Sequence, residues 1–369
     1  MARITRDLRS ENRVHIYEQL QNAQITSRTE LSKMTGISAP TVLRIVDELM
    51  ELGIVRETQL DNHSVGRPCV GLAFQSDYAC TASILHEGSW VTASLMDMSG
   101  KVYASKQESA NADFEQLVRK QIPALIDDLL LQCKMPVKKL AGIGMGFPAV
   151  LDPYENVIEY APLIHINEPL DISAWVSELE ARYDAFVCIE NDVNALVMGE
   201  HAARKLEDRM DMAYVALGTG IGAGLMLRGK LRRGKNNRAG EIGMSLCHDG
   251  RSLEEHIGNR ALEERFGGEN DPQGAMTEYI VDTLSHHLVN YALGFDLDLI
   301  VLGGHTVNRL GKSLVAAVRE KVNALSPLPI RIEEGVSEEP GLEGLGQLLR
   351  SRLIQQLHKI GLDAIKKYL

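Results

Sequence analysis

Residues 186–224 read FVCIENDVNALVMGEHAARKLEDRMDMAYVALGTGIGAG, and this stretch decides the fold class. An apolar run at 186–189 passes through an acidic turn into a helical pattern at 195–204. A second apolar run, at 212–217, meets a glycine-rich turn at 218–224. Short apolar runs are typical of buried strands, and strands that alternate with helices pair largely in parallel beneath those helices. The stretch therefore predicts an α/β fold with largely parallel strands.

The same pattern extends over residues 76–369. Further strands are expected at 80–85, 90–96, 140–145, 222–227 and 299–302, and further helices at 114–133, 172–183, 252–265, 275–293, 310–324 and 342–368. A segment of 294 residues exceeds what one hydrophobic core usually serves, so we expect two α/β lobes. Ligands usually bind in the cleft between such lobes.

The first 75 residues have a different pattern, in which three short helices precede two extended pieces. A helical stripe runs through 12–21, and Ser27 or Thr29 begins a second helix with Glu30 placed for a capping box. A turn at Gly36 leads to a third helix, which Ser38 caps and whose buried face is expected to be Val42, Ile45, Val46 and Leu49. Two helices joined by a tight glycine turn are the helix-turn-helix arrangement.

Two extended pieces, 54–57 and 69–74, flank a polar loop and resemble the wing of a winged helix-turn-helix domain. Base edges are read from the start of the third helix, so the expected DNA contacts there are Ser38, Ala39, Thr41 and Arg44. Arg67, between a glycine and a proline, is expected to enter a minor groove. A small helical protein-interaction domain is the alternative, but the order of turn, cap and wing favours DNA binding.

Charge separates this head from the rest of the chain. Residues 1–70 carry nine basic and nine acidic side chains, whereas the other 299 residues carry 30 and 41, the whole of the net charge of −11. An acidic body behind a neutral head suggests two tasks in one chain. No run of about 18 uncharged apolar residues predicts a membrane span, and the start lacks the apolar core of a signal peptide. The five dispersed cysteines fit reduced thiols, so a cytoplasmic protein is expected.

The order of these motifs resembles the ROK family (repressors, open reading frames, kinases), in particular its repressor branch, such as the xylose and N-acetylglucosamine repressors. The resemblance is carried by Arg28–Leu31, Thr35–Ser38, Gly66–Pro68, Glu190–Ala195, Leu217–Gly224 and Ala239–Gly243. It implies a body of two actin-like, RNase H-like lobes that flank a cleft. The implied domains are a winged helix-turn-helix at 1–75, a first lobe at 76–190 that the helix 342–369 completes, and a second lobe at 191–341 with the sugar site and dimerisation elements.

The resemblance also bears on catalysis. In the family's kinases the Asp that matches Asp192 is the base, and the glycine-rich loop at 218–224 holds phosphates. A further Asp on the opening strand aligns the metal and the phosphates, and Leu85 stands in its place. A leucine cannot hold Mg²⁺, so we expect a degenerate nucleotide site and no enzymatic activity.

Family kinases bind sugar hydroxyls through residues that match Asn191, Asp192, Glu241 and Glu254. Carboxylates and amides suit this task because each can bond two hydroxyls. The family contact that a histidine makes is replaced by Met244, which leaves either a different sugar or a phosphorylated one as the ligand. The alternative role of Asn191 and Asp192 is to cap the following helix.

No metal and no cofactor are expected. Most of the family holds zinc with a histidine and a cysteine-rich loop, but Met244 replaces that histidine and the loop is shortened. Cys247, His248 and His256 remain as candidate ligands, and they do not close a tetrahedral site.

These observations predict a DNA-binding transcriptional regulator of carbohydrate-metabolism genes, most simply a repressor, whose cleft senses a sugar or a sugar phosphate. Its expected partners are a double-stranded operator, the effector, and a second copy in a homodimer or a tetramer, with no membrane. The alternatives are an active sugar kinase that carries a DNA-binding head, and a repressor that a protein partner controls.

Overall fold

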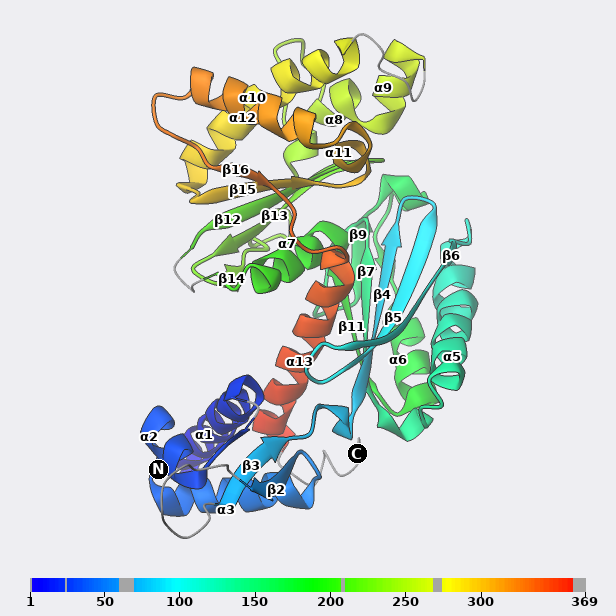
Figure 1. Cartoon of the computed structure of the whole chain (residues 1–369). Helices are drawn as coiled ribbons and strands as arrows, with labels where there is room; N and C mark the ends of the chain where they lie inside the picture. The colour runs from blue at the N-terminus through cyan, green and yellow to red at the C-terminus, as the bar shows by residue number, and fades with distance from the viewer. Residues whose placement is uncertain (1, 24, 60–69, 207–209, 268–273, 361–369) are drawn as a thin grey trace.

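The computed structural model describes residues 2–23, 25–59, 70–206, 210–267 and 274–360. A small head lies at one end of the molecule and two α/β lobes lie beyond it (Figure 1). None of the helices in these ranges has an apolar stretch long enough to cross a membrane.

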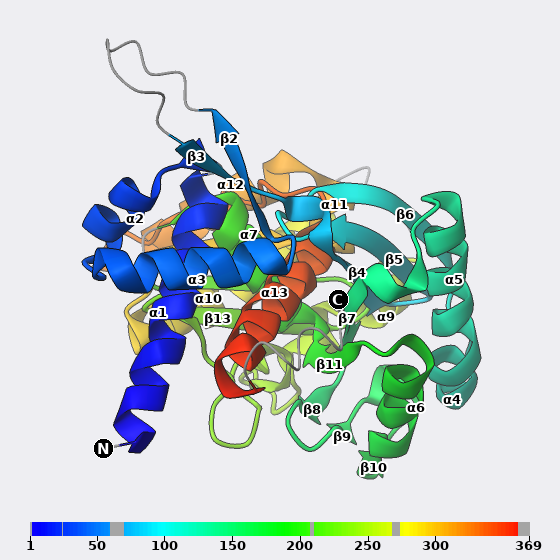
Figure 2. The ribbon, with the colours of Figure 1, turned by 90° about the horizontal axis from the view of Figure 1, so that it is seen from below.

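The head has the predicted helix-turn-helix. Its helices are α1 (Ala2–Ala23), α2 (Arg28–Thr35) and α3 (Ala39–Glu51), and its strands β1 (Ile25–Thr26), β2 (Val55–Gln59) and β3 (Val70–Phe74) pair in the order β1-β3-β2. Ser27 and Glu30 form the predicted capping box, and Gly36 makes the turn with a φ of 69°. The four residues expected on the inner face of α3 are buried in the head core. Figure 2, seen from below, shows α3 in front of the lobes and across α1.

The first lobe is built on a five-stranded sheet of order β11-β7-β4-β5-β6. Its strands are β4 (Cys80–Glu87), β5 (Trp90–Asp97), β6 (Val102–Ser109), β7 (Leu140–Phe147) and β11 (Phe186–Asn191). One face is covered by α4 (Phe114–Gln116), a π-helical turn (Leu117–Gln121), α5 (Ile122–Gln132) and α6 (Ser173–Tyr183). A small sheet beside it holds β8 (Val150–Asp152), β9 (Val157–Tyr160) and β10 (Leu170–Asp171).

The second lobe repeats this plan with a sheet of order β14-β13-β12-β15-β16. Its strands are β12 (Met212–Leu217), β13 (Ile221–Leu227), β14 (Lys230–Leu231), β15 (Leu299–Gly303) and β16 (Ile332–Glu334). Its helices are α8 (Leu253–Ile257), α9 (Asn259–Phe266), α10 (Ala275–Phe295), α11 (His305–Leu310) and α12 (Lys312–Leu325).

Two expectations about these lobes are wrong in detail. The sheets are mixed, because β5 and β13 each pair with their neighbours antiparallel. Tight turns explain the difference: Gly88, with a φ of 58°, lets β4 fold straight back into β5, and Gly218–Gly220 does the same between β12 and β13. The helix expected at 252–265 is two helices, because Gly258 is extended and interrupts it.

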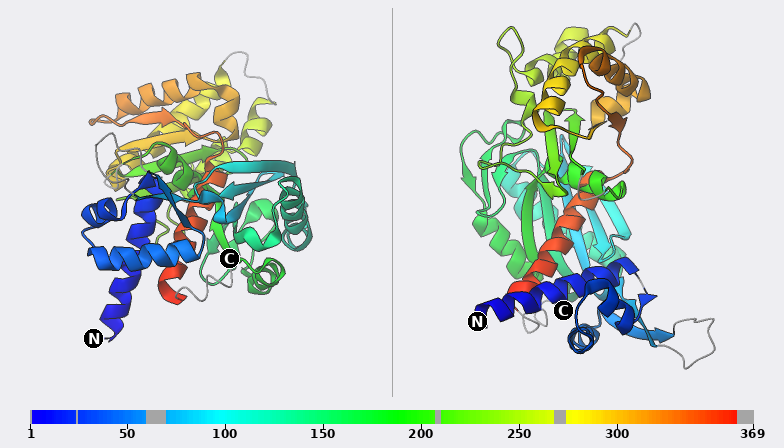
Figure 3. Two further views of the ribbon diagram at one scale, coloured as in Figure 1. Left: turned by 60° about the horizontal axis from the view of Figure 1, so that its bottom comes forward. Right: turned by 90° about the vertical axis from the view of Figure 1, so that its left-hand side faces the viewer.

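Two helices lie between the sheets. α7 (Asp192–Ala203) follows β11, and α13 (Pro340–Ile360) packs along it. The contact is close because two glycines leave no side chain in the way: a Cβ on Gly199 would overlap the Pro340 carbonyl, and one on Gly344 would overlap the Ala195 carbonyl. α13 then crosses the first sheet and reaches α1, as Figure 3 shows, and its Ile354 is part of the head core.

Candidate functional site

The predicted DNA contacts at the start of α3 lie together on an open surface. Ser38, Ala39 and Arg44 are exposed and Thr41 is half-buried. The hydroxyl groups of Ser38 and Thr41 lie 2.9 Å apart, and Ser38 makes no side-chain cap bond. Arg67 lies outside the described residues.

Ion pairs with Glu48 orient the arginine side chains of this surface. Glu48 accepts from Arg13 at 2.9 Å and from Arg44 at 3.4 Å, so Arg44 is oriented along α3. Leu43 is 48% exposed between these residues and was missed by the sequence analysis. Its position off the buried face of α3 is the signal that could have identified it.

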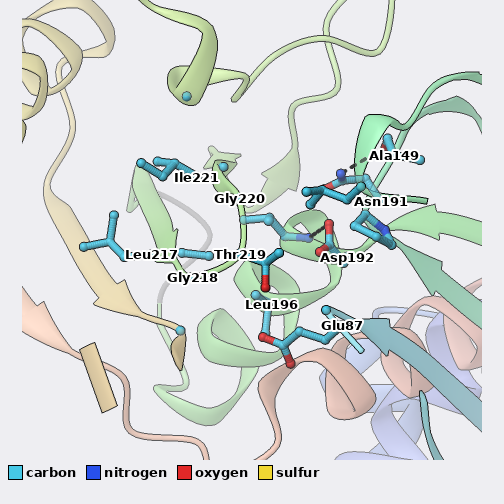
Figure 4. A pocket seen from close by; sticks show the side chains of 18 of the residues that line it. Glu87, Ala149, Asn191, Asp192, Leu196, Leu217, Gly218, Thr219, Gly220 and Ile221 are labelled. Carbon is cyan, nitrogen blue, oxygen red and sulfur yellow. Dashed lines mark hydrogen bonds between the residues drawn. The ribbon is translucent and has the colours of Figure 1, made fainter. Parts of the chain in front are cut away.

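The four residues predicted to bind a ligand line one cavity between the two lobes, with a volume of about 610 Å³. They arrive from three segments: Asn191 and Asp192 from the β11–α7 junction, Glu241 from the loop after β14, and Glu254 from α8. Figure 4 shows Asp192 facing the glycine-rich turn at Gly218–Gly220 across this cavity.

Asn191 also caps α7, which was the alternative role. Its Oδ1 accepts from the Asn194 N–H at 2.9 Å, and its Nδ2 donates to the Ala149 carbonyl at 3.1 Å. Each of these atoms can make one more hydrogen bond, so capping and ligand binding are compatible. Asp192 Oδ1 accepts from the Val193 N–H at 2.9 Å.

The cavity carries a concentration of acidic groups whose pKa values are raised. Burial, together with the nearby Glu87 and Glu241, raises the pKa of Asp192 to about 8. Burial also raises the pKa of Glu87, and burial with Glu254 raises that of Glu241. Glu254 Oε2 accepts from the Ile221 N–H at 3.0 Å, which ties α8 to the glycine-rich turn. These groups place hydrogen-bond acceptors and a carboxyl that is protonated near neutral pH, that of Asp192, on the cavity wall.

A buried ion pair behind the cavity was not predicted. Glu190, 1% exposed at the end of β11, accepts from Arg233 of the second lobe and from Asn194 Nδ2 at 3.0 Å. Its carboxylate also accepts from the Asn191 N–H at 3.0 Å. The pair joins the two lobes next to Asn191. The sequence features that could have predicted this ion pair are an acidic residue near the end of a strand, Glu190, and the adjacent arginines 232 and 233.

The region that resembles a nucleotide site opens into the same cavity, because Gly88, Ser89 and Gly218–Gly220 are among its lining residues. Leu85 packs among Met96, Ala195, Leu342 and Leu345 and is not one of the described residues that line the cavity. The two turns that match the phosphate loops of the family's kinases lie close together, since a Cβ on Gly88 would lie 3.1 Å from Thr219 Oγ1. Among the described lining residues there is no lysine or arginine.

The candidate zinc ligands are engaged elsewhere. His256 bonds Tyr279 Oη at 2.7 Å and Asp249 Oδ1 at 3.0 Å, while Cys247 Sγ lies 3.5 Å from Nε2 of His287. Within the described ranges, no three His, Cys, Asp or Glu side chains are grouped so that they could hold a metal ion.

Comparison with known proteins matches residues 86–330 to the ROK family and residues 9–56 to the winged helix-turn-helix DNA-binding family. The xylose repressor of Bacillus subtilis is 27% identical over 253 residues, and the DNA-binding transcriptional dual regulator NagC of Escherichia coli is 23% identical over 265. These matches cover 68% and 69% of this chain and 64% of each relative, so the chain aligns with less than two thirds of these regulators.

Solved structures share the fold. A ROK family transcriptional regulator, described as a homologue of E. coli MLC, superimposes with a TM-score of 0.77 at 18% identity, over 96% of this chain and 99% of that one. A ROK family glucokinase from Streptomyces griseus, solved with glucose and AMPPNP, gives a TM-score of 0.61 at 20% identity over 74% of this chain and all of the other. With a family match that spans both lobes and a winged helix-turn-helix in front of it, this chain belongs to the ROK family.

Proposed function

We propose that this chain is a DNA-binding transcriptional repressor of carbohydrate-metabolism genes whose inter-lobe cleft binds a sugar effector. The observation that carries the proposal is that a single helix, α13, contacts both the body beside the cavity and the DNA-binding head. At its start α13 packs beside Leu85 and Ala195 under the cavity, and further along its Ile354 enters the head core. The similarity to xylose and N-acetylglucosamine repressors supports the same assignment.

In this proposal the head reads an operator. Ser38, Ala39, Thr41 and Arg44 face base edges of a major groove, and Arg67 enters the adjacent minor groove. A homodimer places two heads on half-sites one helical turn apart. Residues 1–75 form the DNA-binding domain, 76–190 with the C-terminal helix form the first lobe, and 191–341 form the second.

The cleft holds the effector through the four residues predicted from the sequence. Asn191, Asp192, Glu241 and Glu254 line the cavity with acceptors for hydroxyl groups, and a buried hydroxyl without its partner would cost about 1–3 kcal/mol. The ion pair between Glu190 and Arg233 fixes the backbone from which Asn191 and Asp192 project.

The chain has no phosphoryl-transfer activity in this proposal. Asp192 stands where a base would, but Leu85, in the place of the Asp that aligns the metal and the phosphates, is apolar and buried. Phosphate groups also need cationic or metal partners, and the described cavity wall offers no lysine or arginine.

Effector binding reaches the head through α7 and α13. Asp192 begins α7, whose backbone is in contact with that of α13 at Gly199 and Gly344. A shift of α7 on ligand closure therefore moves α13 as a rigid body, and with it the head core around Ile354.

The test combines DNA binding with turnover. A fluorescent operator fragment, selected from random DNA with the purified protein, is titrated with and without sugars at fixed salt. We expect sequence-specific binding that at least one sugar changes, and no ADP above background with ATP, Mg²⁺ and the same sugars. Turnover that disappears in Asp192→Asn would favour the kinase alternative, and absence of specific DNA binding would overturn the proposal.

A further inference from the structure

One part of the cavity is built by residues that the proposed sugar contacts do not use. Trp90 and Thr92 on β5 and Gln107 on β6 line the cavity on the first-lobe side. These positions follow the turn at Gly88 and Ser89, which also line it. The cavity is thus continuous from Glu241 and Glu254 to the edge of the first sheet.

Strand alternation explains why these side chains face the cleft. Val91, Ala93 and Leu95 of β5 are in the lobe core, so Trp90 and Thr92 project from the opposite face. Gln107 is the cross-strand neighbour of Thr92 on the same face, and its Nε2 donates to Thr92 Oγ1 at 3.1 Å. This bond orients the Gln107 amide, and the hydrogen bonds of the described residues include none to its Oε1.

Trp90 is 50% exposed within this wall. An indole ring is a large apolar surface with one polar N–H, and it is stabilised when a flat partner covers it. The C–H face of a pyranose ring is such a partner, because its hydroxyl groups point outward and leave the ring face apolar. A tryptophan beside an amide and a hydroxyl therefore suits a sugar ring that stacks and donates hydrogen bonds.

The volume of the cavity and the charges on its wall restrict the class of ligand further. The volume of about 610 Å³ lies within the range of roughly 300–1,000 Å³ for pockets that enclose drug-sized molecules, which are much larger than one pyranose. The described wall carries the carboxyl groups of Glu87, Asp192, Glu241 and Glu254, one histidine (His305), and no lysine or arginine. An added phosphate would find no lysine or arginine to pair with on this wall, so an uncharged ligand is favoured.

We infer that the effector is an uncharged oligosaccharide or glycoside, with one ring held by Asn191, Asp192, Glu241 and Glu254 and a second ring stacked on Trp90 beside Gln107. This inference rests on the proposed function and names the ligand class of the same cleft. The second ring adds contacts that a monosaccharide cannot make.

Isothermal titration calorimetry with matched sugars tests the inference. The probes are xylose and xylobiose, glucose with maltose and cellobiose, N-acetylglucosamine and chitobiose, and the 6-phosphates of glucose and N-acetylglucosamine. We expect one disaccharide to bind roughly ten-fold more tightly than its monosaccharide, which is the upper end of a single stacking contact. The phosphorylated sugars should bind most weakly.

Substitutions at Trp90 test whether this residue causes the tighter binding of the disaccharide. Trp90→Ala should reduce the ratio of disaccharide to monosaccharide affinity towards one, and Trp90→Phe should restore most of it. Tyr154→Ala removes a 67% exposed aromatic residue outside the cavity and serves as the matched control. Melting temperatures of the three variants confirm that each is folded.

The outcomes are distinct. Two results would contradict the second ring stacked on Trp90 and leave the proposed function in place. One is a monosaccharide that binds as tightly as every disaccharide, and the other is a Trp90→Ala variant that keeps the wild-type ratio of disaccharide to monosaccharide affinity. A sugar phosphate that binds most tightly would overturn the uncharged ligand. If none of the sugars binds, both this inference and the sugar-sensing function are wrong.

Discussion

Replacing Asp192 by Asn should make the free protein more stable, by an amount that grows with pH. Asp192 lies in the cavity wall, where burial and the nearby Glu87 and Glu241 raise its pKa from 3.8 to about 8. The folded state therefore holds this proton more tightly than the unfolded state. The stability that the bound proton contributes is complete below about pH 4, decreases as the pH rises, and is fully lost above about pH 8.

The size of the effect follows from that interval. A single site changes the free energy of unfolding by at most about 1.4 kcal/mol per pH unit between its two pKa values. Because the cavity is open to solvent and screens part of the charge, we expect a gain of about 1–2 kcal/mol between pH 6 and pH 8. Asn at position 192 has an oxygen that can still accept the Val193 N–H, so the start of α7 is preserved.

The assay is urea unfolding of wild type and Asp192→Asn at pH 6, 7, 8 and 9. The stability difference should rise to pH 8 and then level off. Asp171→Asn is the control: Ser173 lowers the pKa of that exposed carboxyl, so it is ionised in both states throughout this range and its difference should not change. A difference for Asp192→Asn that is constant from pH 6 to pH 9 would refute the raised pKa and its cause, which is burial together with the nearby Glu87 and Glu241.

Four further predictions concern the head, the cleft, their connection and metal. Arg44→Ala should weaken operator binding by about 1–3 kcal/mol at fixed salt, whereas Arg260→Ala, which removes a 91% exposed arginine of the second lobe, should not. Glu254→Ala should raise the effector dissociation constant about 5- to 150-fold and leave operator affinity without effector unchanged; an unshifted titration would contradict the site. Ile354→Ala should destabilise the protein by about 2–5 kcal/mol and reduce the effector's influence on DNA binding, and a full response in a folded variant would contradict the role of α13. Chelator should leave the melting temperature unchanged, and one zinc per chain by elemental analysis would contradict this.

The sequence predicted well the features that depend on residues a few positions apart. The capping box of Ser27 and Glu30, the turn at Gly36 and the buried face of α3 all match the structure. The strand expected at 212–217 is β12, residue for residue. Capping bonds and amphipathic periodicity are set within one or two turns of chain, which is why a single sequence carries them.

Features that depend on pairing were predicted less well. The sheets are mixed because two short turns fold strands back on themselves, and strand character alone does not distinguish a hairpin from a crossover. β6 was missed, since it lies at the sheet edge and its side chains alternate between exposed and half-buried without an apolar run.

The sequence by itself determined the winged helix-turn-helix and the α/β class of the body, and its resemblance to the ROK family supplied the four residues proposed for the ligand site. Only the tertiary structure decided what these residues share. It brought Asn191, Glu241 and Glu254 to one cavity with Trp90. It also gave α13 two partners, the underside of the cavity at one end and the head core at the other. The physical reason is that periodicity reports which face of an element is buried, whereas the partner that buries it comes from a distant part of the chain.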